Sequence, residues 1–260
     1  MGEKTSIAWT DATFSPVWGC ERVSPGCQYC FAAALANRWQ PKAKLWDGDN
    51  FRTFGVKHWA LPFKWNDRAA REHRRIKVFC GSMCDVFDKR WPAGIRERLW
   101  ETIRGTPHLD WQLVTKRIGN AKWMLPPDWG TGWPNVWIIA SIVNQEEANR
   151  DMDKLLYLPA QIRGVSYEPA LGPVDWRRWV GETDWIIYGG ESNQGGCREA
   201  KLEWAEQTVE QCRTAGVAVF VKQLGSDPTW KGAPYLMGHP SPRTDPRDWP
   251  EHLSVQEFPR

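Results

Sequence analysis

The chain has 260 residues and a mass of 30.0 kDa, which is enough for one large α/β domain or two smaller ones. Its 34 basic and 31 acidic residues give a formal net charge of +3, a balance too mild to identify nucleic acid as a partner. Hydrophobic residues at 42% and charged residues at 25% are ordinary for a soluble globular protein and exclude wholesale disorder and a collagen-like architecture.

Short β-branched or aromatic runs alternate with segments long enough for helices, as expected of repeated βα units. The predicted strands are 14–18, 77–80, 111–115, 136–142, 163–167, 185–188 and 217–222. The predicted helices are 30–39, 67–75, 93–104, 145–156 and 202–215. This order predicts the α/β class, specifically a partial or distorted TIM-type (β/α) barrel with parallel strands.

We expect a single barrel domain over residues 1–225, with a Trp-rich insertion at about 40–65, and a Pro-rich tail over 226–260 that forms a strap or lid. No apolar stretch reaches the roughly 20 residues that cross a bilayer, so we expect no membrane segment. The N-terminus lacks an apolar signal core, and the seven cysteines therefore favour metal or redox chemistry in the cytoplasm over disulfides.

Tryptophan is unusually frequent, with 19 copies, and many of them stand beside polar or turn residues. Trp46, Trp129 and Trp249 are examples that suggest half-buried rings. Half-buried indoles can stack on bases or sugars, and they can equally pack under loops and along helix faces.

Polar residues follow several predicted strands directly. These junctions are 80–85, 115–117, 141–144, 167–169, 188–192 and 222–223. Because parallel barrels place their chemistry at the carboxyl ends of their strands, we expect a composite site to which most strands contribute.

Three cysteines, Cys20, Cys27 and Cys30, form a C-x6-C-x2-C array directly after the first predicted strand. Three thiolates this close in a Pro- and Gly-containing loop can surround one metal centre. His58 is not at a spaced partner position for a fourth zinc ligand, and three ligands leave one position open for catalysis. An iron–sulfur cluster, a zinc ion and unligated thiols remain alternatives at this point.

The array resembles the radical S-adenosylmethionine (SAM) superfamily, in which three cysteines bind a [4Fe–4S] cluster, although the usual first gap is three residues and here it is six. Tyr29 occupies the aromatic position before the last cysteine. The chain is similar almost end to end to a phage-associated family of short three-cysteine radical-SAM-like proteins, whose tyrosine after the third cysteine is replaced here by Phe31. The matching stretches are 7–13, 20–30, 115–117, 168–175, 189–192 and 220–223.

The resemblance implies that Cys20, Cys27 and Cys30 hold the cluster and that SAM is cleaved to a 5′-deoxyadenosyl radical, which abstracts hydrogen from a substrate. Tyr29 is expected to line the adenine pocket. Gly81 and Ser82 follow the second strand, where such barrels bind the amino group of the cofactor, although a plain tight turn is the alternative.

Further residues at strand ends complete the expected site. Ser141 and Asn144 suit the ribose or the carboxylate of the cofactor. Glu168 and Glu191 suit polar groups of cofactor or substrate, although the Gly189-Gly190-Glu191 segment follows too late a strand for the amino-group role. Three basic residues also lie at strand ends, namely Lys116, Arg117 and Lys222. They either neutralise the carboxylate of the cofactor or a phosphate of the substrate, or they pair with these two glutamates. We assign Arg117 to cofactor binding, and Lys116, Glu168, Glu191 and Lys222 to catalysis.

Four cysteines lie outside the array, and the resemblance gives them no role. They are Cys80, Cys84, Cys197 and Cys212. Free cysteines commonly behave as small buried hydrophobes, and the alternative is an auxiliary cluster.

Residues 64–77 include six basic residues against Asp67 and Glu72, with Trp65 beside them. Such a run either tracks a phosphate backbone or forms a solvated helix face. We therefore expect a radical SAM enzyme that acts on a nucleic-acid base or nucleotide. The alternatives are the same chemistry on a small metabolite or peptide, and a non-catalytic zinc-stabilised binding module.

The expected partners are an electron donor, of flavodoxin or ferredoxin type or a chemical reductant, and nucleic acid. The expected location is the cytoplasm, that of a bacterial host if the chain is phage-encoded. The oligomeric state is left open.

Overall fold

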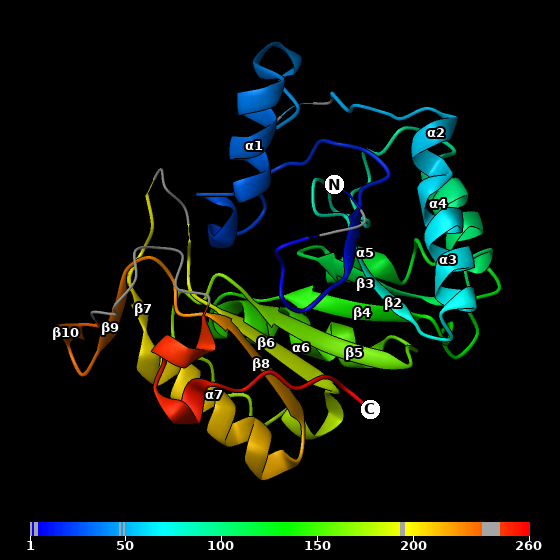
Figure 1. Cartoon of the computed structure of the whole chain (residues 1–260). Helices are drawn as coiled ribbons and strands as arrows, with labels where there is room; N and C mark the ends of the chain where they lie inside the picture. Colours follow the sequence, from blue (N-terminus) through cyan, green and yellow to red (C-terminus); the bar gives the residue numbers. More distant parts are fainter. Residues whose placement is uncertain (1, 3–4, 47, 49, 193–195, 236–244) are drawn as a thin grey trace. The chain divides into compact units, whose positions relative to one another are not determined.

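A computed structural model describes residues 2, 5–46, 48, 50–192, 196–235 and 245–260 (Figure 1). The chain divides into two compact units, and each is described by itself. The first comprises Met1–Val23, Cys30–Ile139 and Leu158–Gln161, and the second comprises Ser24–Tyr29, Ala140–Tyr157 and Ile162–Arg260. The predicted domain boundaries remain predictions.

The first unit contains three parallel strands and most of a fourth. The strands are β1 (Ala12–Phe14), β2 (Ile76–Cys80), β3 (Leu109–Thr115) and β4 (Val136–Ser141), of which β4 continues into the second unit. The helices are α1 (Phe31–Trp39), α2 (Val56–Trp59), α3 (Leu61–Arg71), α4 (Ile95–Arg104) and α5 (Ile118–Ala121), with 3-10 turns at Pro25–Cys27 and Pro41–Ala43 before and after α1. Helix α3 packs against β2 and β3.

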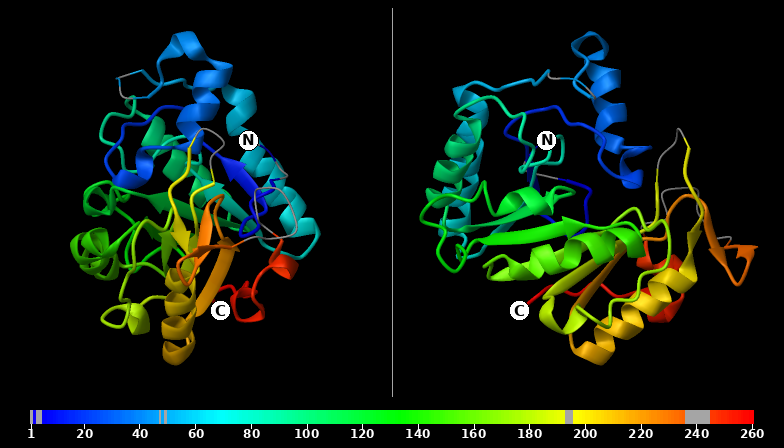
Figure 2. Two further views of the ribbon diagram at one scale, coloured as in Figure 1. Left: turned by 90° about the vertical axis from the view of Figure 1, so that its left-hand side faces the viewer. Right: turned by 180° about the vertical axis from the view of Figure 1, so that it is seen from behind.

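The second unit contains β5 (Ile162–Tyr167), β6 (Trp185–Gly189) and β8 (Ala218–Gln223), which pair in parallel. Its helices are α6 (Gln145–Tyr157) and α7 (Leu202–Ala215), with 3-10 turns at Val180–Glu182, Pro246–Asp248 and Glu251–Leu253. A small sheet is formed by β7 (Ala200–Lys201), β9 (Pro228–Trp230) and β10 (Ala233–Pro234). Helix α7 packs against β8, and the right-hand view of Figure 2 shows these two elements side by side.

The main sheet has seven strands in the order β1-β2-β3-β4-β5-β6-β8, and its described pairings are parallel. An α-helix lies in each crossover between successive strands except that from β5 to β6, which has a 3-10 turn. This is the pattern of a partial TIM-type (β/α) barrel. The predicted fold class is therefore confirmed. All six residues of β4 are buried, as expected for a parallel strand covered on both faces.

The seven predicted strands all exist, and their ends differ by a few residues. The largest shift is in β1, which pairs Ala12–Phe14 with β2, whereas the predicted strand was 14–18. Pro16 has no N–H to donate to a ladder, which is consistent with pairing that stops before it. Helix α3 begins earlier than predicted because Pro62, in its first turn, is suited to a helix start.

The tail does not consist only of irregular chain. Residues 228–234 supply β9 and β10, and residues near the C-terminus bond to β8, with Val221 N donating to Val255 O and Glu257 N donating to Val219 O. The indole N–H of Trp185 also donates to Glu257 O at 2.8 Å. The chain near the C-terminus is therefore hydrogen-bonded along β8, the last strand of the main sheet.

Among the described residues, no helix is both long and apolar enough to cross a membrane.

Stability should fall when His58 is protonated. Its ring stacks on Phe14 and Phe54 with centroids 4.7 Å and 4.2 Å away, and its Nε2 donates to Ser15 O at 3.0 Å. Burial lowers the pKa of His58 from its usual value, although the bond to Ser15 opposes this shift. The unfolded chain therefore takes up this proton first, and the free energy of unfolding should drop as the pH falls through about 6.5.

Urea unfolding between pH 7.5 and 5.5 measures this dependence. His58→Phe, which keeps a stacking ring but cannot be protonated, should show a flatter dependence than the parent chain. The exposed His108 provides the control, since His108→Gln should keep the parent slope. Equal slopes for all three proteins would contradict the assignment.

Candidate functional site

The cysteine array follows β1 and is divided between the two units. Cys20 and Cys30 belong to the first unit and Cys27 to the second. All three are free thiols of intermediate exposure. Among the described residues, no three His, Cys, Asp or Glu side chains form a group that could hold a metal ion. The metal assignment of the array consequently depends on the chemistry of its donors.

Backbone pairing fixes the chain around Cys20. Gly19 N donates to Met83 O, and Cys20 N donates to Leu45 O, both at 3.1 Å. At the other end of the array, Cys30 packs against a buried cluster that includes Trp18, Leu45 and Met83. The same small core therefore supports both cysteines of the first unit.

The guanidinium of Arg117 lies against the first half of the array. Its Nη1 donates to Cys20 Sγ at 3.6 Å, and its Nη2 donates to Glu21 O at 2.9 Å. Nη1 also donates to Asp85 Oδ2 at 3.2 Å, and Nη2 lies 3.5 Å from Asp88 Oδ2. The Arg117 side chain is only 9% exposed, so solvent screens these charges weakly.

Asp85 is held by four donors. Its Oδ1 accepts from Phe87 N at 3.0 Å and from the Thr115 hydroxyl at 2.7 Å. Its Oδ2 accepts from Lys116 N at 2.9 Å as well as from Arg117. Asp85 thereby joins the loop after β2 to the loop after β3.

The charges in this cluster shift one another's protonation. Burial raises the pKa of Cys20 to about 11, and Arg117 acts in the opposite direction. Burial also acts to lower the pKa of Arg117, but Asp85, Cys20 and Asp88 outweigh it and hold that pKa above its usual value. For Asp88, hydrogen bonds from Arg90 overcome the effect of burial and lower the pKa of the carboxyl. Arg117 and Asp88 are therefore charged near neutral pH.

A second arginine, Arg198, holds the segment that carries Cys27. Ser24 begins this segment by accepting a bond from Gly26 N, and Arg198 Nη1 donates to Pro25 O at 3.1 Å and to Gln28 Oε1 at 3.3 Å. The Arg198 guanidinium also lies 5.3 Å from the ring centre of Tyr29. Two N–H groups of the same guanidinium donate to Glu191, which is 5% exposed, at 2.6 Å and 2.9 Å.

Glu168 and Lys222 pair at the ends of β5 and β8. Lys222 Nζ donates to Glu168 Oε1, which also accepts from Gln223 Nε2 at 3.0 Å. A Cβ on Gly189 would lie 3.0 Å from Glu168 Cδ, so any larger residue there would require this carboxylate to shift. Both charged side chains are about one-fifth exposed, which leaves the pair open to a polar ligand.

The other predicted site residues form local turns and caps. Gly81, with φ +89°, donates its N–H to Phe14 O, and the Ser82 and Ser15 hydroxyls lie 3.2 Å apart. The Ser141 hydroxyl donates to Glu168 O at 3.3 Å, and Asn144 Oδ1 accepts from Glu147 N at the start of α6. The structure therefore places Ser141 with Glu168, and Lys116, through its backbone N–H, with Asp85.

The cysteines outside the array are in different surroundings. Cys80 and Cys212 are buried, and burial raises the pKa of Cys80 and brings that of Cys212 to about 12. The pKa of Cys84 also lies well above its usual value because of burial. These thiols are therefore protonated near neutral pH.

The basic segment 64–77 is partly neutralised. Arg74 pairs with Glu72, Arg75 with Asp110 and Lys77 with Asp11. Trp65 is 3% exposed and therefore presents no ring on which a base could stack. The exposed Lys64 and Arg71 lie on α3.

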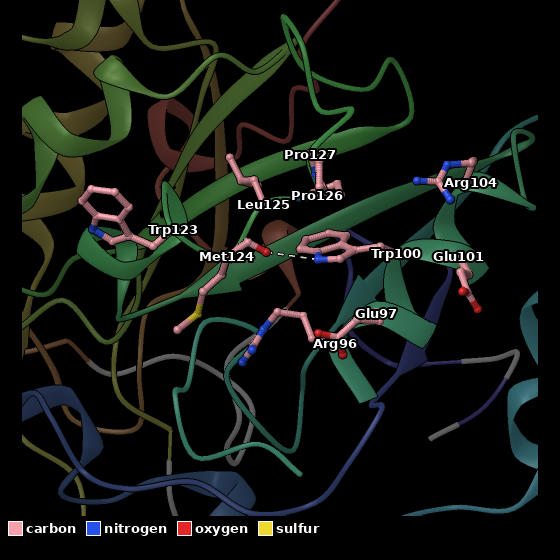
Figure 3. A pocket seen from close by; sticks show the side chains of 10 residues that line it. All are labelled: Arg96, Glu97, Trp100, Glu101, Arg104, Trp123, Met124, Leu125, Pro126 and Pro127. Atoms are coloured by element: carbon pink, nitrogen blue, oxygen red, sulfur yellow. Dashed lines mark hydrogen bonds between the residues drawn. The ribbon is translucent and has the colours of Figure 1, made fainter. Parts of the chain in front are cut away.

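A surface pocket of about 340 Å³ lies between α4 and the chain after α5 (Figure 3). Figure 3 shows the Trp100 indole donating to Met124 O, a bond of 3.1 Å. No residue of the predicted site lines this pocket.

The sequence analysis did not select three residues that support the array segments. Asp85 and Asp88 hold Arg117 in the first unit, and Arg198 holds the segment that carries Cys27 in the second. Asp85 follows Cys84 in a junction that was already expected to be functional, and its position was therefore a usable signal. Arg198 stands 170 residues from Gln28, and no local pattern indicates their contact.

The fold defines an α/β protein of the partial TIM-barrel type. Residues 4–241 match the family described as "Protein of unknown function (DUF5131)", and the chain belongs to this family.

Solved structures of other proteins are similar to part of this chain. One similar structure is a double mutant of spore photoproduct lyase with bound AdoMet and dinucleoside spore photoproduct, at 13% identity and a TM-score of 0.48, covering 74% of this chain and 59% of that one. Another is a point mutant of spore photoproduct lyase, at 13% identity and a TM-score of 0.46. The match covers 82% of this chain and 64% of that one. The chain thus spans less than two thirds of either protein. No curated protein matches the sequence.

Removing the Arg198 side chain should destabilise the second unit, because Glu191 would lose its charged partner while staying buried. The Arg198 side chain is 29% exposed, so we expect Arg198→Met to cost about 1–3 kcal/mol, less than for a fully buried pair.

Arg177→Met is the matched control, since Arg177 makes a similar forked pair with Asp175 on the surface. This variant should change the free energy of unfolding far less than Arg198→Met does, because solvent screens an exposed pair. Urea unfolding measures both, and equal effects would contradict the importance of the Glu191 pair.

Proposed function

We propose that the chain is a radical SAM enzyme. The observation that carries the proposal is the set of three free cysteines directly after β1 of a seven-stranded parallel (β/α) sheet. Polar groups at the ends of β3, β5 and β8 support it, because this fold class places its chemistry at the carboxyl ends of strands.

The donor set fits a [4Fe–4S] cluster. Three free thiols supply three ligands and leave one iron open for SAM, and neither disulfides nor histidines are needed. Such a cluster, when bound, supplies the electron that cleaves SAM reductively to the 5′-deoxyadenosyl radical. An external electron donor of flavodoxin or ferredoxin type and a cytoplasmic location are part of the proposal.

The residues of the chain would provide binding and positioning. We propose that Tyr29 lines the adenine pocket and that the turn of Gly81 and Ser82, at the end of β2, receives the amino group of SAM. Ser141 and Asn144 follow β4, where they can face the ribose or carboxylate. Their present hydrogen bonds to Glu168 O and Glu147 N hold them in place.

The Glu168–Lys222 pair suits a polar group of the substrate. Its carboxylate and ammonium are partly exposed and held by Gln223, so the pair can both donate and accept hydrogen bonds. Glu191 is occupied by Arg198, which favours a positioning role over direct contact with substrate.

We further propose that the substrate is a nucleic-acid base or nucleotide. The support is the basic segment 64–77, from which Lys64 and Arg71 are exposed on α3. The alternative is a small metabolite or peptide substrate, and the binding test below separates it from nucleic acid. The phage association is a separate hypothesis.

The cysteine array should be necessary for iron binding. After anaerobic reconstitution we expect about four irons per chain and a brown protein. With dithionite and SAM, this protein should release 5′-deoxyadenosine. Replacing Cys20, Cys27 or Cys30 with alanine should abolish the release, whereas Cys212→Ala, on the buried face of α7, should keep it.

A colourless protein that holds one zinc ion and forms no nucleoside would overturn the radical enzyme and favour a zinc-stabilised binding module. Equal iron content in the three array variants and the parent would refute the ligand assignment.

Nucleic-acid binding should depend steeply on salt. Each phosphate contact contributes a slope of about −0.9 in log affinity against log salt for duplex DNA. Replacing both Lys64 and Arg71 with glutamine should therefore weaken binding to short duplex and single-stranded DNA and reduce the slope. The charge-matched control replaces both Arg177 and Arg178 with glutamine, since these two arginines are already paired with Asp175 and Asp153. Weak, salt-insensitive binding by the parent chain would favour the small-molecule alternative.

A further inference from the structure

We infer that Arg117 is a positioning residue that donates a hydrogen bond to the Cys20 sulfur and thereby raises the reduction potential of the metal centre at the array. This inference rests on the proposed function and adds to it a role for Arg117 that differs from contact with SAM. Asp85 and Asp88 are assigned as the groups that hold Arg117 in place.

The first step of the argument is geometric. Arg117 Nη1 lies between Cys20 Sγ at 3.6 Å and Asp85 Oδ2 at 3.2 Å. Nη2 donates to Glu21 O at 2.9 Å, so the guanidinium contacts both the ligand side chain and the backbone that follows it. A planar fork with this many donors can make all these bonds at once.

The second step concerns what fixes the guanidinium. Arg117 N donates to the Thr115 hydroxyl at 2.8 Å, and that hydroxyl donates to Asp85 Oδ1 at 2.7 Å. Asp85 and Asp88 have side chains that are 7% and 3% exposed. Buried carboxylates require charged partners, and they therefore oppose any movement of Arg117 toward solvent.

The third step concerns charge. Asp88 already has a charged partner in Arg90, whose Nη2 lies 2.7 Å from Asp88 Oδ2. Arg117 can therefore donate to Asp85 and to the Cys20 sulfur at the same time. Hydrogen bonds to ligand sulfurs and nearby positive charge stabilise the more negative, reduced state of an iron–sulfur centre. The Arg117 guanidinium therefore makes the centre easier to reduce than it would be beside Asp85 and Asp88 alone.

The decisive experiment is a redox titration of the reconstituted protein. Absorption and electron paramagnetic resonance spectra, recorded at each potential, measure the reduced fraction. Arg117→Met keeps much of the side-chain volume but removes the donor and the charge. We expect its potential to shift in the negative direction from that of the parent chain. A potential equal to the parent value would overturn the inference while leaving the proposed function intact.

Arg96→Met is the matched control. Arg96 also holds the loop after β2, by donating to Val86 O at 3.1 Å and to Asp88 O, and none of its described bonds reaches a cysteine. Loosening this loop without removing the sulfur contact should leave the potential near the parent value. An equal shift in Arg96→Met and Arg117→Met would also overturn the inference, because the effect would then be structural.

If Arg117→Met fails to fold, Arg117→Lys provides the measurement. Lysine keeps the charge that Asp85 needs but lacks the fork that reaches Asp85, Glu21 O and Cys20 Sγ together. A smaller shift in the same direction supports the inference, and an unchanged potential opposes it.

A second probe separates this inference from the proposed function. If the parent chain takes up no iron–sulfur cluster, the proposed function fails, and Co²⁺ is then used as the metal. A hydrogen-bonded thiolate gives up its electrons less readily, so the thiolate-to-cobalt absorption band should move to lower energy in Arg117→Met. An unmoved band, or a parent chain that binds neither a cluster nor Co²⁺, overturns the role assigned to Arg117.

Discussion

A carboxylate that is removed from water requires a charged partner, and this constraint organises the chain around the cysteine array. Asp85 and Asp88 in the first unit and Glu191 in the second are each 5% exposed or less. Their arginine partners donate their remaining N–H groups to the array segments. Arg117 donates to Cys20 Sγ and Glu21 O, and Arg198 donates to Pro25 O and Gln28 Oε1. In each unit, pairing the buried charge therefore also fixes the loop.

The fold was largely predictable because hydrophobic periodicity is a local signal. The run Val136–Ser141 is apolar enough to indicate a buried strand by itself, and α7 carries Leu202, Ala205, Val209 and Cys212 on one face before Gly216 ends it. The small sheet was not predictable, since β7 and β10 have two residues each, which is too short for any period. Their pairing depends on contacts between distant segments.

The candidate site was predictable in part, for a related reason. The residue types at the strand ends were visible in the sequence, including Glu168 and Lys222, whose pairing was one of the stated alternatives. The choice of partner for Arg117 and Glu191 was not visible. Arg117 pairs with Asp85 and Asp88, and Glu191 pairs with Arg198. Two arginines and four carboxylates allow many pairings, and only the three-dimensional course of the loops selects among them.

The tryptophan content has a structural explanation that weakens its value as a sign of nucleic-acid binding. Trp129 and Trp249, whose polar neighbours suggested half-buried rings, are both buried. Several buried indoles donate to carbonyl oxygens of irregular chain, including Trp100 to Met124, Trp129 to Pro159 and Trp185 to Glu257. One side chain thus supplies a large apolar surface and also satisfies a loop carbonyl that has no partner in regular structure. Long connections between short strands create many such carbonyls. Tryptophan stabilises a chain of this kind whatever substrate the protein binds. Evidence on the substrate must therefore come from the distribution of charged residues and from the polar residues at the strand ends.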